Sequence, residues 1–313
     1  MIQAIVPLAR RLAPRALMIA IVLFVLVFSA LQPAFLKPEN LIGIVRQVSL
    51  VGIMAVCMTF VIMTGGIDLS VGPVLAMAGL VAVFALDAGQ ALPVSLAAGI
   101  SIGVLIGLTN GFLVGVFGLP PIIVTLAMLS VVRGSALIVG GPDLHAIRGH
   151  YSYTFIGTGS LVGLPMPICL FAVVATAAAF LQFATPLGVR VAAIGDNERA
   201  AYLSGQRVWR TKLAIYALSS FGASVAGIIL TSQVHTAAAT YGEFGTELDV
   251  IASVVLGGTS LSGGRGSVVR TVLGVLFLGV MNSGMAILNV PIDGQLIAKG
   301  LLIALALAAA ELQ

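Results

Sequence analysis

The chain has 313 residues, of which 59% are hydrophobic and only 8% are charged, and its formal net charge is +4. Its mean hydropathy is +1.16. Soluble domains carry about 25% charged residues, so this chain cannot cover a globular surface with ionised groups. The composition excludes a cytosolic enzyme, a nucleic-acid binder and a secreted module, and indicates a protein surrounded by membrane lipid.

Cysteine and histidine are too scarce to build a metal site. Cys57 and Cys169 both lie in apolar runs, where thiols behave as small hydrophobic side chains rather than as a disulfide. The three histidines have neither i, i+4 spacing nor a neighbouring cysteine pair. The eleven acidic residues are scattered along the connections. We therefore predict no catalytic residues, no metal and no cofactor.

The first apolar run follows Arg10, Arg11 and Arg15 and extends from Ala16 through Leu36. A basic segment before an apolar run is also typical of a cleaved signal peptide. Because this run is long and opens a chain full of similar segments, we interpret it as an uncleaved first membrane span.

Nine more apolar segments follow the first one. They lie near 44–64, 71–87, 93–117, 121–140, 165–184, 212–233, 248–262, 268–288 and 295–311. Backbone groups in lipid need internal hydrogen-bond partners, so the spans must be helices. The predicted fold is an all-α polytopic membrane protein with about ten transmembrane helices in one domain, 1–313. The segment 248–262 is short for a crossing, which needs about 20 residues.

The distribution of basic residues predicts the topology. With the N-terminus inside, ten spans place both termini in the cytoplasm. Ten of the fifteen basic residues then lie inside and three outside, with Arg133 and Lys299 in spans. The inside group is Arg10, Arg11, Arg15, Arg190, Arg199, Arg207, Arg210, Lys212, Arg265 and Arg270, and the outside group is Lys37, Arg46 and Arg148. This distribution satisfies the positive-inside rule.

The longest polar connection on the predicted inner side is 185–211. Asp196 or Asn197 can cap a helix start, and Glu198 favours its positive first turn. Gly205 supplies a left-handed residue that ends the helix after about two turns. So short a helix is not stable alone in water. It either rests on lipid headgroups or docks on a cytoplasmic partner.

Residues 64–72 read TGGIDLSVG, and residues 247–264 read ELDVIASVVLGGTSLSGG. A third motif, in the 185–211 connection, consists of Thr185, Gly188, Ala193, Ile194, Gly195, Asn197, Ala200, Ala201, Ser204 and Gly205. These three motifs resemble those of the permease subunits of bacterial ABC sugar importers of the ribose type. Asp196 departs from the family pattern, which commonly has a second glycine there. The matches extend from about residue 40 to residue 305.

The resemblance implies a transport subunit that works with other chains. In the family, the loop between the sixth and seventh spans carries the coupling helix, which sits in a groove of the ATPase. The implied ATPase-coupling residues are Asp196, Asn197, Glu198, Ala200, Ala201, Ser204 and Gly205. The implied partners are an ABC ATPase, a periplasmic sugar-binding protein and a second permease, identical or related. The implied location is the bacterial inner membrane.

Polar residues at the depth of the spans are candidates for the substrate path. Asp68 interrupts the apolar stretch from 44 to 87, where a carboxylate costs roughly 2.5–3.5 kcal/mol if it faces the bilayer centre. Asp68 and Ser70 either line the path or cap the next helix. Asn110 and Asn282 can likewise bind hydroxyls of a sugar, or simply join helices. The sequence leaves both alternatives open.

Gly257 to Gly264 repeats the GGxxLSxG pattern of Gly65 to Gly72, as an internal repeat or by chance. A phosphate-binding loop is excluded there, because Arg265 stands where the motif requires Lys followed by Ser or Thr. ATP must therefore be hydrolysed by another chain.

On the predicted outer side, Glu243, Glu247 and Asp249 are candidate contacts for a basic surface of the receptor, although ordinary solvated loops explain them too. We expect an ATP-driven importer of a monosaccharide or related polyol that works by alternating access. The alternatives are an ion-coupled secondary transporter that uses Asp68 and a membrane-embedded enzyme. The sequence does not identify the sugar.

Overall fold

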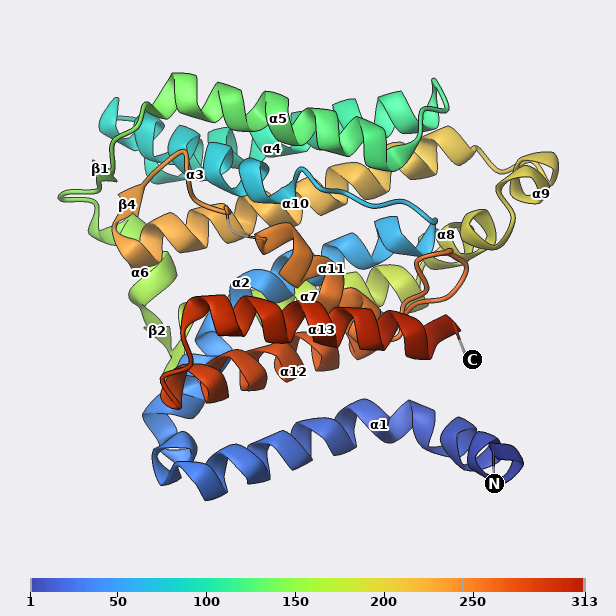
Figure 1. Ribbon diagram of the computed structural model, residues 1–313. Coiled ribbons are helices and arrows are strands. Elements are labelled where there is room, and N and C mark those ends of the chain that lie inside the picture. The colour runs from blue at the N-terminus through green and yellow to red at the C-terminus, as the bar shows by residue number, and fades with distance from the viewer. Residues whose placement is uncertain (1, 244, 312–313) are drawn as a thin grey trace.

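The computed structural model describes the backbone of residues 2–243 and 245–311 and the side chains of 17–243, 245–302 and 304 (Figure 1). Most of these residues are helical. The helices are α1 (Ile2–Leu31), α2 (Pro38–Met63), α3 (Val71–Asp87), α4 (Leu92–Gly115), α5 (Pro121–Gly140), α6 (Tyr151–Thr158), α7 (Met166–Phe183), α8 (Pro186–Asp196), α9 (Glu198–Leu203), α10 (Val208–Val234), α11 (Thr246–Leu256), α12 (Val268–Ile287) and α13 (Ile292–Glu311), with a 3-10 turn η1 (Pro33–Leu36).

Four two-residue strands form two small antiparallel pairs in the connections. Strand β1 (His145–Ala146) pairs with β4 (Thr236–Ala237), and β2 (Ser160–Leu161) pairs with β3 (Leu164–Pro165). The first pair ties the connection after α5 to the end of α10.

Each of the ten predicted apolar segments contains a helix, and six helices among the described residues are long and apolar enough to cross a membrane: α2, α4, α5, α7, α10 and α12. The chain is therefore a polytopic α-helical membrane protein. The segment 248–262 differs from the prediction, since α11 has eleven residues and ends at Leu256. Gly257 and Gly258, the latter with φ +81°, end it. At 1.5 Å per residue, α11 falls well short of the bilayer core.

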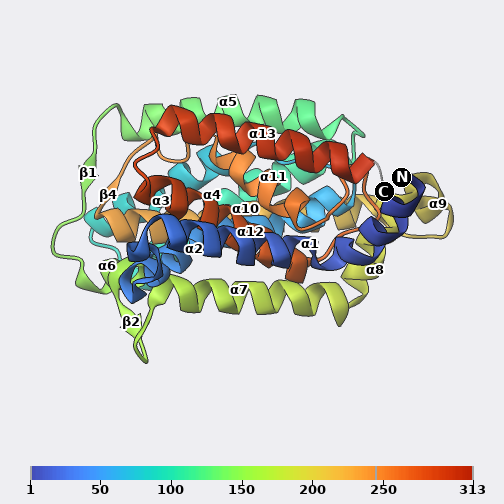
Figure 2. The same cartoon turned by 60° about the horizontal axis from the view of Figure 1, so that its bottom comes forward.

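Helices α2 and α10 lie at the centre of the bundle and pack against each other. From Ile53 to Met63 every residue of α2 is buried, as expected for a helix that is hydrophobic on all sides. Helices α3, α4 and α5 lie on one side of this pair, and α12, α13 and α1 on the other (Figure 1). Helix α7 covers a further face of α2 (Figure 2).

The close contact between α4 and α10 follows from a stripe of glycines. Gly103, Gly107 and Gly111 recur every fourth residue of α4, so they lie on one face. A Cβ at Gly111 would meet the backbone of Leu213 in α10 at 2.6 Å. Small residues at this spacing let two membrane helices approach closely.

The order of helices repeats once, and the second set runs through the bundle in the opposite direction to the first (Figure 1). In α2–α5 and in α10–α13, a long helix leads into a shorter one, which two long helices follow. Helices α3 and α4 pack on α10, whereas α11 and α12 pack on α2. The two GGxxLSxG segments do not occupy equivalent places in this repeat, because the first follows α2 and the second follows α11. Their similarity is therefore not that of a parallel repeat.

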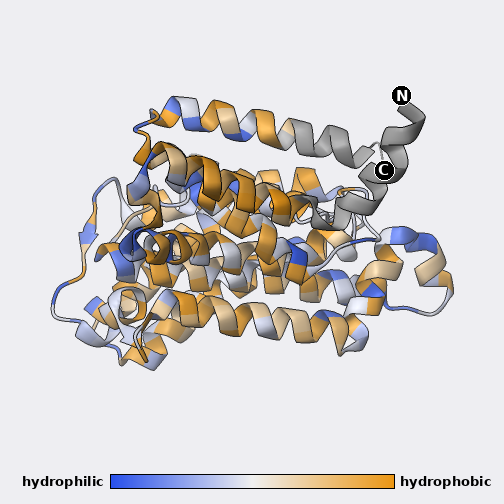
Figure 3. Ribbon diagram, turned by 90° about the horizontal axis from the view of Figure 1, so that it is seen from below, coloured by the Kyte–Doolittle hydropathy of each residue, from blue (hydrophilic) through white to orange (hydrophobic). Residues whose placement is uncertain are grey.

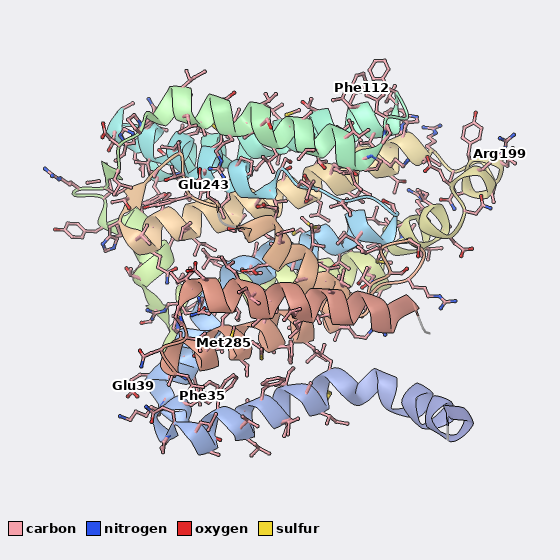
Figure 4. The ribbon with its side chains drawn as sticks, in the orientation of Figure 1. Phe35, Glu39, Phe112, Arg199, Glu243 and Met285 are labelled. Atoms are coloured by element: carbon pink, nitrogen blue, oxygen red, sulfur yellow. The ribbon has the colours of Figure 1, made fainter. Side chains whose placement is uncertain are left out.

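Polar residues gather at the two ends of the bundle, and hydrophobic residues cover its length (Figure 3). One end, here the α9 end, holds α8, α9, the start of α1 and the finish of α13 (Figure 1). The opposite end holds η1, α6 and both strand pairs. Arg199 lies at the α9 end, and Glu39 at the opposite one (Figure 4).

At the opposite end, α6 is fastened to α10 by buried hydroxyls. The Tyr153 hydroxyl lies 2.6 Å from Thr231 Oγ1, and Ser232 Oγ accepts from the Gly157 N–H at 2.7 Å. Burial raises the pKa of Tyr153 to about 12, so its phenol stays neutral and can donate. This contact orders the connection between α5 and α7.

Candidate functional site

The connection 185–211 contains the short helix that its capping residues predict. Helix α9 begins after Asn197, whose side chain accepts a hydrogen bond from the Ala200 N–H at 2.9 Å. Gly205, with φ +86°, follows its end. Asn197 rather than Asp196 is thus the cap. Of the seven predicted coupling residues only Ala201 is buried, and the other six are exposed.

A second helix in the connection, α8, was not predicted. Its start carries a clear signal, because Thr185 accepts a hydrogen bond from the Leu187 N–H and Pro186 occupies the first turn. Ile194 of α8 packs with Ala201 and Val208 in a small cluster that holds the loop together. On the surface of α9 that faces away from the bundle, Tyr202 and Leu203 are 68% and 74% exposed. These two apolar side chains project from a polar end of the molecule.

An ion pair joins α9 to the transmembrane bundle. Lys212 of α10 donates to both carboxylate oxygens of Glu198, at 2.6 and 2.7 Å. The Lys212 side chain is only 10% exposed, whereas that of Glu198 is 53% exposed. This ion pair is a direct contact between α9 and the beginning of α10.

The three sequence motifs meet beneath α8. The Gly264 N–H donates to the carbonyl of Met63 at 2.9 Å. A Cβ on Gly195 of α8 would overlap both of these groups, and a Cβ on Gly263 would lie 3.0 Å from Gly65 N of the first motif. Gln182 of α7 adds two bonds, donating to Gly266 O at 2.9 Å and accepting from the Val268 N–H at 2.8 Å. The motifs are thus parts of one glycine-lined junction between the loop and the bundle.

Asp68, Ser70 and Asn110 form one buried hydrogen-bonded network. Asp68 accepts from Ser70 N at 3.0 Å, from Ser70 Oγ at 2.6 Å and from Ser219 Oγ at 2.8 Å. Asn110 Nδ2 donates to Ser70 Oγ at 3.0 Å. Asp68, Ser70, Asn110 and Ser219 are all 0% exposed. The network joins α3, α4 and α10 and faces no described cavity.

The Asp68 side chain also holds the chain in a turn just before α3, since it accepts from the N–H two residues ahead. Ser70 is the residue at the cap position, and its own side chain makes no capping bond. Thr125 of α5 supports the same turn by donating to Ile67 O at 3.0 Å. Ser219 and Thr125 carry no motif that could have identified them from the sequence.

Asn282 lies apart from this network. It lines a cavity of about 200 Å³ between α2, α11, α12 and α13. Asp249 lines the same cavity, and its carboxylate accepts from Lys299 Nζ at 2.9 Å. The four predicted path residues therefore divide into a buried network of three and one member of a separate polar cavity.

Of the other two candidate receptor contacts, Glu243 is exposed and Glu247 is half-buried beside Gly72. The Glu243 carboxylate lies 3.9 Å from Arg133 Nε of α5. Arg133 also donates to the carbonyls of Tyr241 and Gly242, at 2.8 and 3.2 Å. An arginine in a predicted span thus anchors the connection between α10 and α11.

Comparison with known proteins identifies the family. Residues 40–308 match the family described as "branched-chain amino acid transport system / permease component". The ribose import permease protein RbsC of Bacillus subtilis (strain 168) is 41% identical over 91% of this chain and 88% of its own length. RbsC of Escherichia coli (strain K12) is 39% identical over 92% and 91%, and the L-arabinose ABC transporter permease protein AraH of Azospirillum brasilense is 35% identical over 91% and 85%.

The chain belongs to this family of ABC-importer permeases, in the group that resembles sugar permeases. No solved structure matches it.

Proposed function

We propose that this chain is the permease subunit of an ATP-driven importer that moves a monosaccharide or related polyol from the periplasm to the cytoplasm. One observation carries the proposal: the similarity to ribose and L-arabinose permeases extends over about nine-tenths of the chain. The D-allose permease protein AlsC of Escherichia coli (strain K12) is 34% identical over a similar length. ATP hydrolysis belongs to a partner chain.

The α9 end faces the cytoplasm in this proposal, and the protein resides in the bacterial inner membrane with both termini cytoplasmic. The connection at this end carries Arg190, Arg199, Arg207 and Arg210, in keeping with the positive-inside rule. Ten crossings place both termini on this side. The opposite end then faces the periplasm, where the exposed Glu243 and the neighbouring Glu247 are candidate contacts for a sugar-binding protein.

The exposed surface of α9 is the proposed docking site for the ATPase. Asp196 to Ala200, Ser204 and Gly205 are exposed around it, and Tyr202 and Leu203 offer apolar contacts for a groove. The same two side chains could instead rest among lipid headgroups, so the docking role needs a direct test. Residues 198–205 must then be required for retention of the ATPase but not for insertion into the membrane.

Alternating access would use the contacts between loop and bundle. When the ATPase pair closes on ATP, a shift of α9 reaches α10 through the Glu198–Lys212 pair. Two turns further along α10, Ser219 contacts Asp68 and hence α3 and α4. Movement of these helices relative to a second permease, identical or related, would open the path to one side and close it to the other.

The ion-coupled alternative receives no support from Asp68. Both of its carboxylate oxygens already accept hydrogen bonds from described side chains, and the residue is 0% exposed. Carboxylates of ion and proton paths in membranes face a water-filled cavity or pair with one another, and the fully buried Asp68 has no charged partner among the described residues. We therefore assign Asp68 and Ser70 to the structure of the α2–α3 turn rather than to direct contact with substrate.

The test is purification of the tagged chain from its native membranes in mild detergent, followed by identification of bound proteins. The proposal predicts a stoichiometric ABC ATPase. Replacing 198–205 with a flexible Gly-Ser linker should release the ATPase while the chain still inserts in the membrane. As a matched control, the loop 159–163 at the opposite end can be replaced in the same way, and the ATPase should stay bound. Retention of the ATPase by the first variant would refute docking at α9.

A further inference from the structure

A polar cavity lies between α2, α11, α12 and α13, and none of its lining residues belongs to the network around Asp68. Its volume of about 200 Å³ equals that of about six or seven liquid waters. Polar side chains reach it from all four helices: Gln47, Asp249, Asn282, Gln295 and Lys299. They lie within about 14 Å of the helix ends that face away from α9. In the proposed topology this is the periplasmic half of the membrane.

The charges in this cavity neutralise each other. Lys299 Nζ lies 2.9 Å from Asp249 Oδ2, and the two side chains are 19% and 25% exposed. An ammonium has three donors and a carboxylate has two acceptor oxygens. Among the described residues the pair uses one donor and one oxygen on each other, so both groups keep hydrogen-bonding capacity toward the cavity.

Two amides add further capacity. Asn282 Oδ1 is buried and has no hydrogen-bond partner among the described residues. Gln295 donates through Nε2 to Val290 O at 2.9 Å, which leaves its amide oxygen as an acceptor. Buried acceptors without a donor are rare in folded proteins, because they lose their bond to water without replacing it. Asn282 is therefore placed to accept from a ligand.

The combination selects a type of ligand. A free cation or anion gains little beside an ion pair that is already neutral. A neutral molecule with several hydroxyls can donate to Asp249 and Asn282 and accept from Lys299 at the same time. The cavity is small compared with the 300–1,000 Å³ of usual ligand pockets, which favours a single sugar ring over an oligosaccharide.

We infer that this cavity binds the hydroxyls of a monosaccharide during transport, so that each permease subunit has its own sugar site on the periplasmic side. The inference rests on the proposed function and deepens it. It places substrate contact at Asn282, Asp249 and Lys299, away from Asp68.

The first experiment measures uptake by the complete importer in proteoliposomes, with D-ribose, L-arabinose and D-allose as probes. We expect Asn282→Leu to lower the initial uptake rate at least tenfold, because it removes a proposed contact to the sugar. The thermal stability of the complex should not fall, because no described residue donates to the Asn282 amide oxygen. The matched control is Ser283→Ala on the same helix. Ser283 donates to Asn40 at 3.0 Å and is not a lining residue of the cavity, so its uptake should stay within twofold of wild type.

A second readout does not depend on turnover. In a background with Cys57→Ala and Cys169→Ala, an Asn282→Cys variant is labelled with a small thiol reagent, with and without each sugar. We expect the transported sugar to slow labelling at least fivefold, and sucrose to have no effect.

If the wild-type complex transports a sugar, but Asn282→Leu transports it equally well and the labelling rate is unchanged by it, the cavity is not the sugar site while the proposed function stands. If the wild-type complex transports no monosaccharide or polyol that its receptor binds, in the presence of ATP, the proposed function fails and the inference with it.

Discussion

Asp68 and Asp249 are two acidic residues that lie between helices of the bundle, and their surroundings differ. Asp68 is 0% exposed and accepts three hydrogen bonds from Ser70 and Ser219. Asp249 is partly exposed, has one described partner, Lys299, and borders a cavity. The first carboxylate is saturated by its own chain, whereas the second keeps an oxygen available.

In our proposal this difference separates a structural role for Asp68 from a binding role for Asp249. An acidic residue inside a membrane protein is by default a candidate for function, because burying it is costly. For Asp68 this cost is offset by hydrogen bonds from Ser70 and Ser219. The bond from the Ser70 N–H also holds the turn between α2 and α3. For Asp249 the cost is offset only in part, by a neutral pair that can still bond to a ligand. Asp68 and Asp249 both carry a carboxylate, but they differ in how many of its oxygens already accept a hydrogen bond.

The largest expected effect comes from Asp68→Leu. It leaves the Ser70 N–H and the hydroxyls of Ser70 and Ser219 without an acceptor, at about 1–3 kcal/mol for each buried donor. A loss of several kcal/mol approaches the whole stability of a domain. We expect little monodisperse protein by size-exclusion chromatography. A well-folded variant that merely fails to transport would show that Asp68 contacts substrate instead.

The second effect concerns the other carboxylate. Asp249→Leu leaves the Lys299 ammonium unpaired, which costs about 2 kcal/mol, less than for a fully buried pair because both side chains are partly exposed. The double variant Asp249→Leu, Lys299→Met should recover thermal stability but not sugar uptake. Recovery of both properties would reduce the pair to a helix contact.

A smaller effect is expected for Ser219→Ala. It removes one of the three hydrogen bonds to Asp68, which lowers stability by about 1–2 kcal/mol. Ser224→Ala is the matched control, because this serine is equally buried in α10 but donates to Ser220 O of its own helix. Thermal denaturation of the two variants should differ by several degrees. Equal melting temperatures would mean that Asp68 does not depend on α10.

The smallest effect is expected for Tyr216→Phe. The Tyr216 hydroxyl is buried and has no partner among the described residues, although it lies in the same helix as Ser219. Its removal should change stability by less than about 0.5 kcal/mol. A loss larger than 1 kcal/mol would reveal a hydrogen bond outside the network described for Asp68.

Local features of the fold could be predicted from the sequence. The apolar segments, the cap at Asn197 and the helix end at Gly205 depend on neighbouring residues and are present as expected. Helix α8 was not predicted, although the cap at Thr185 and Pro186 in the first turn signal its start. The number of crossings stays a prediction, since α3 and α11 are short.

Contacts between distant residues could not be predicted in this way. Nothing in the spacing of Met63, Gly195 and Gly264 indicates that the three motifs meet beneath α8. Asp249 was likewise predicted as a receptor contact and Lys299 as a residue within a span. Their pairing was not predicted, because it joins positions fifty residues apart. Such contacts depend on how the two inverted sets of helices pack, which hydrophobic periodicity does not encode.

The most direct test of the account is sugar uptake into proteoliposomes that contain this permease, its ATPase and its loaded receptor. With radiolabelled D-ribose, L-arabinose and D-allose, we predict uptake of at least one sugar. This uptake should require ATP on the side of the membrane that carries the ATPase. Uptake should persist when proton and sodium gradients are abolished. Uptake that continues without ATP and collapses with an ion gradient would contradict the account and favour the ion-coupled transporter.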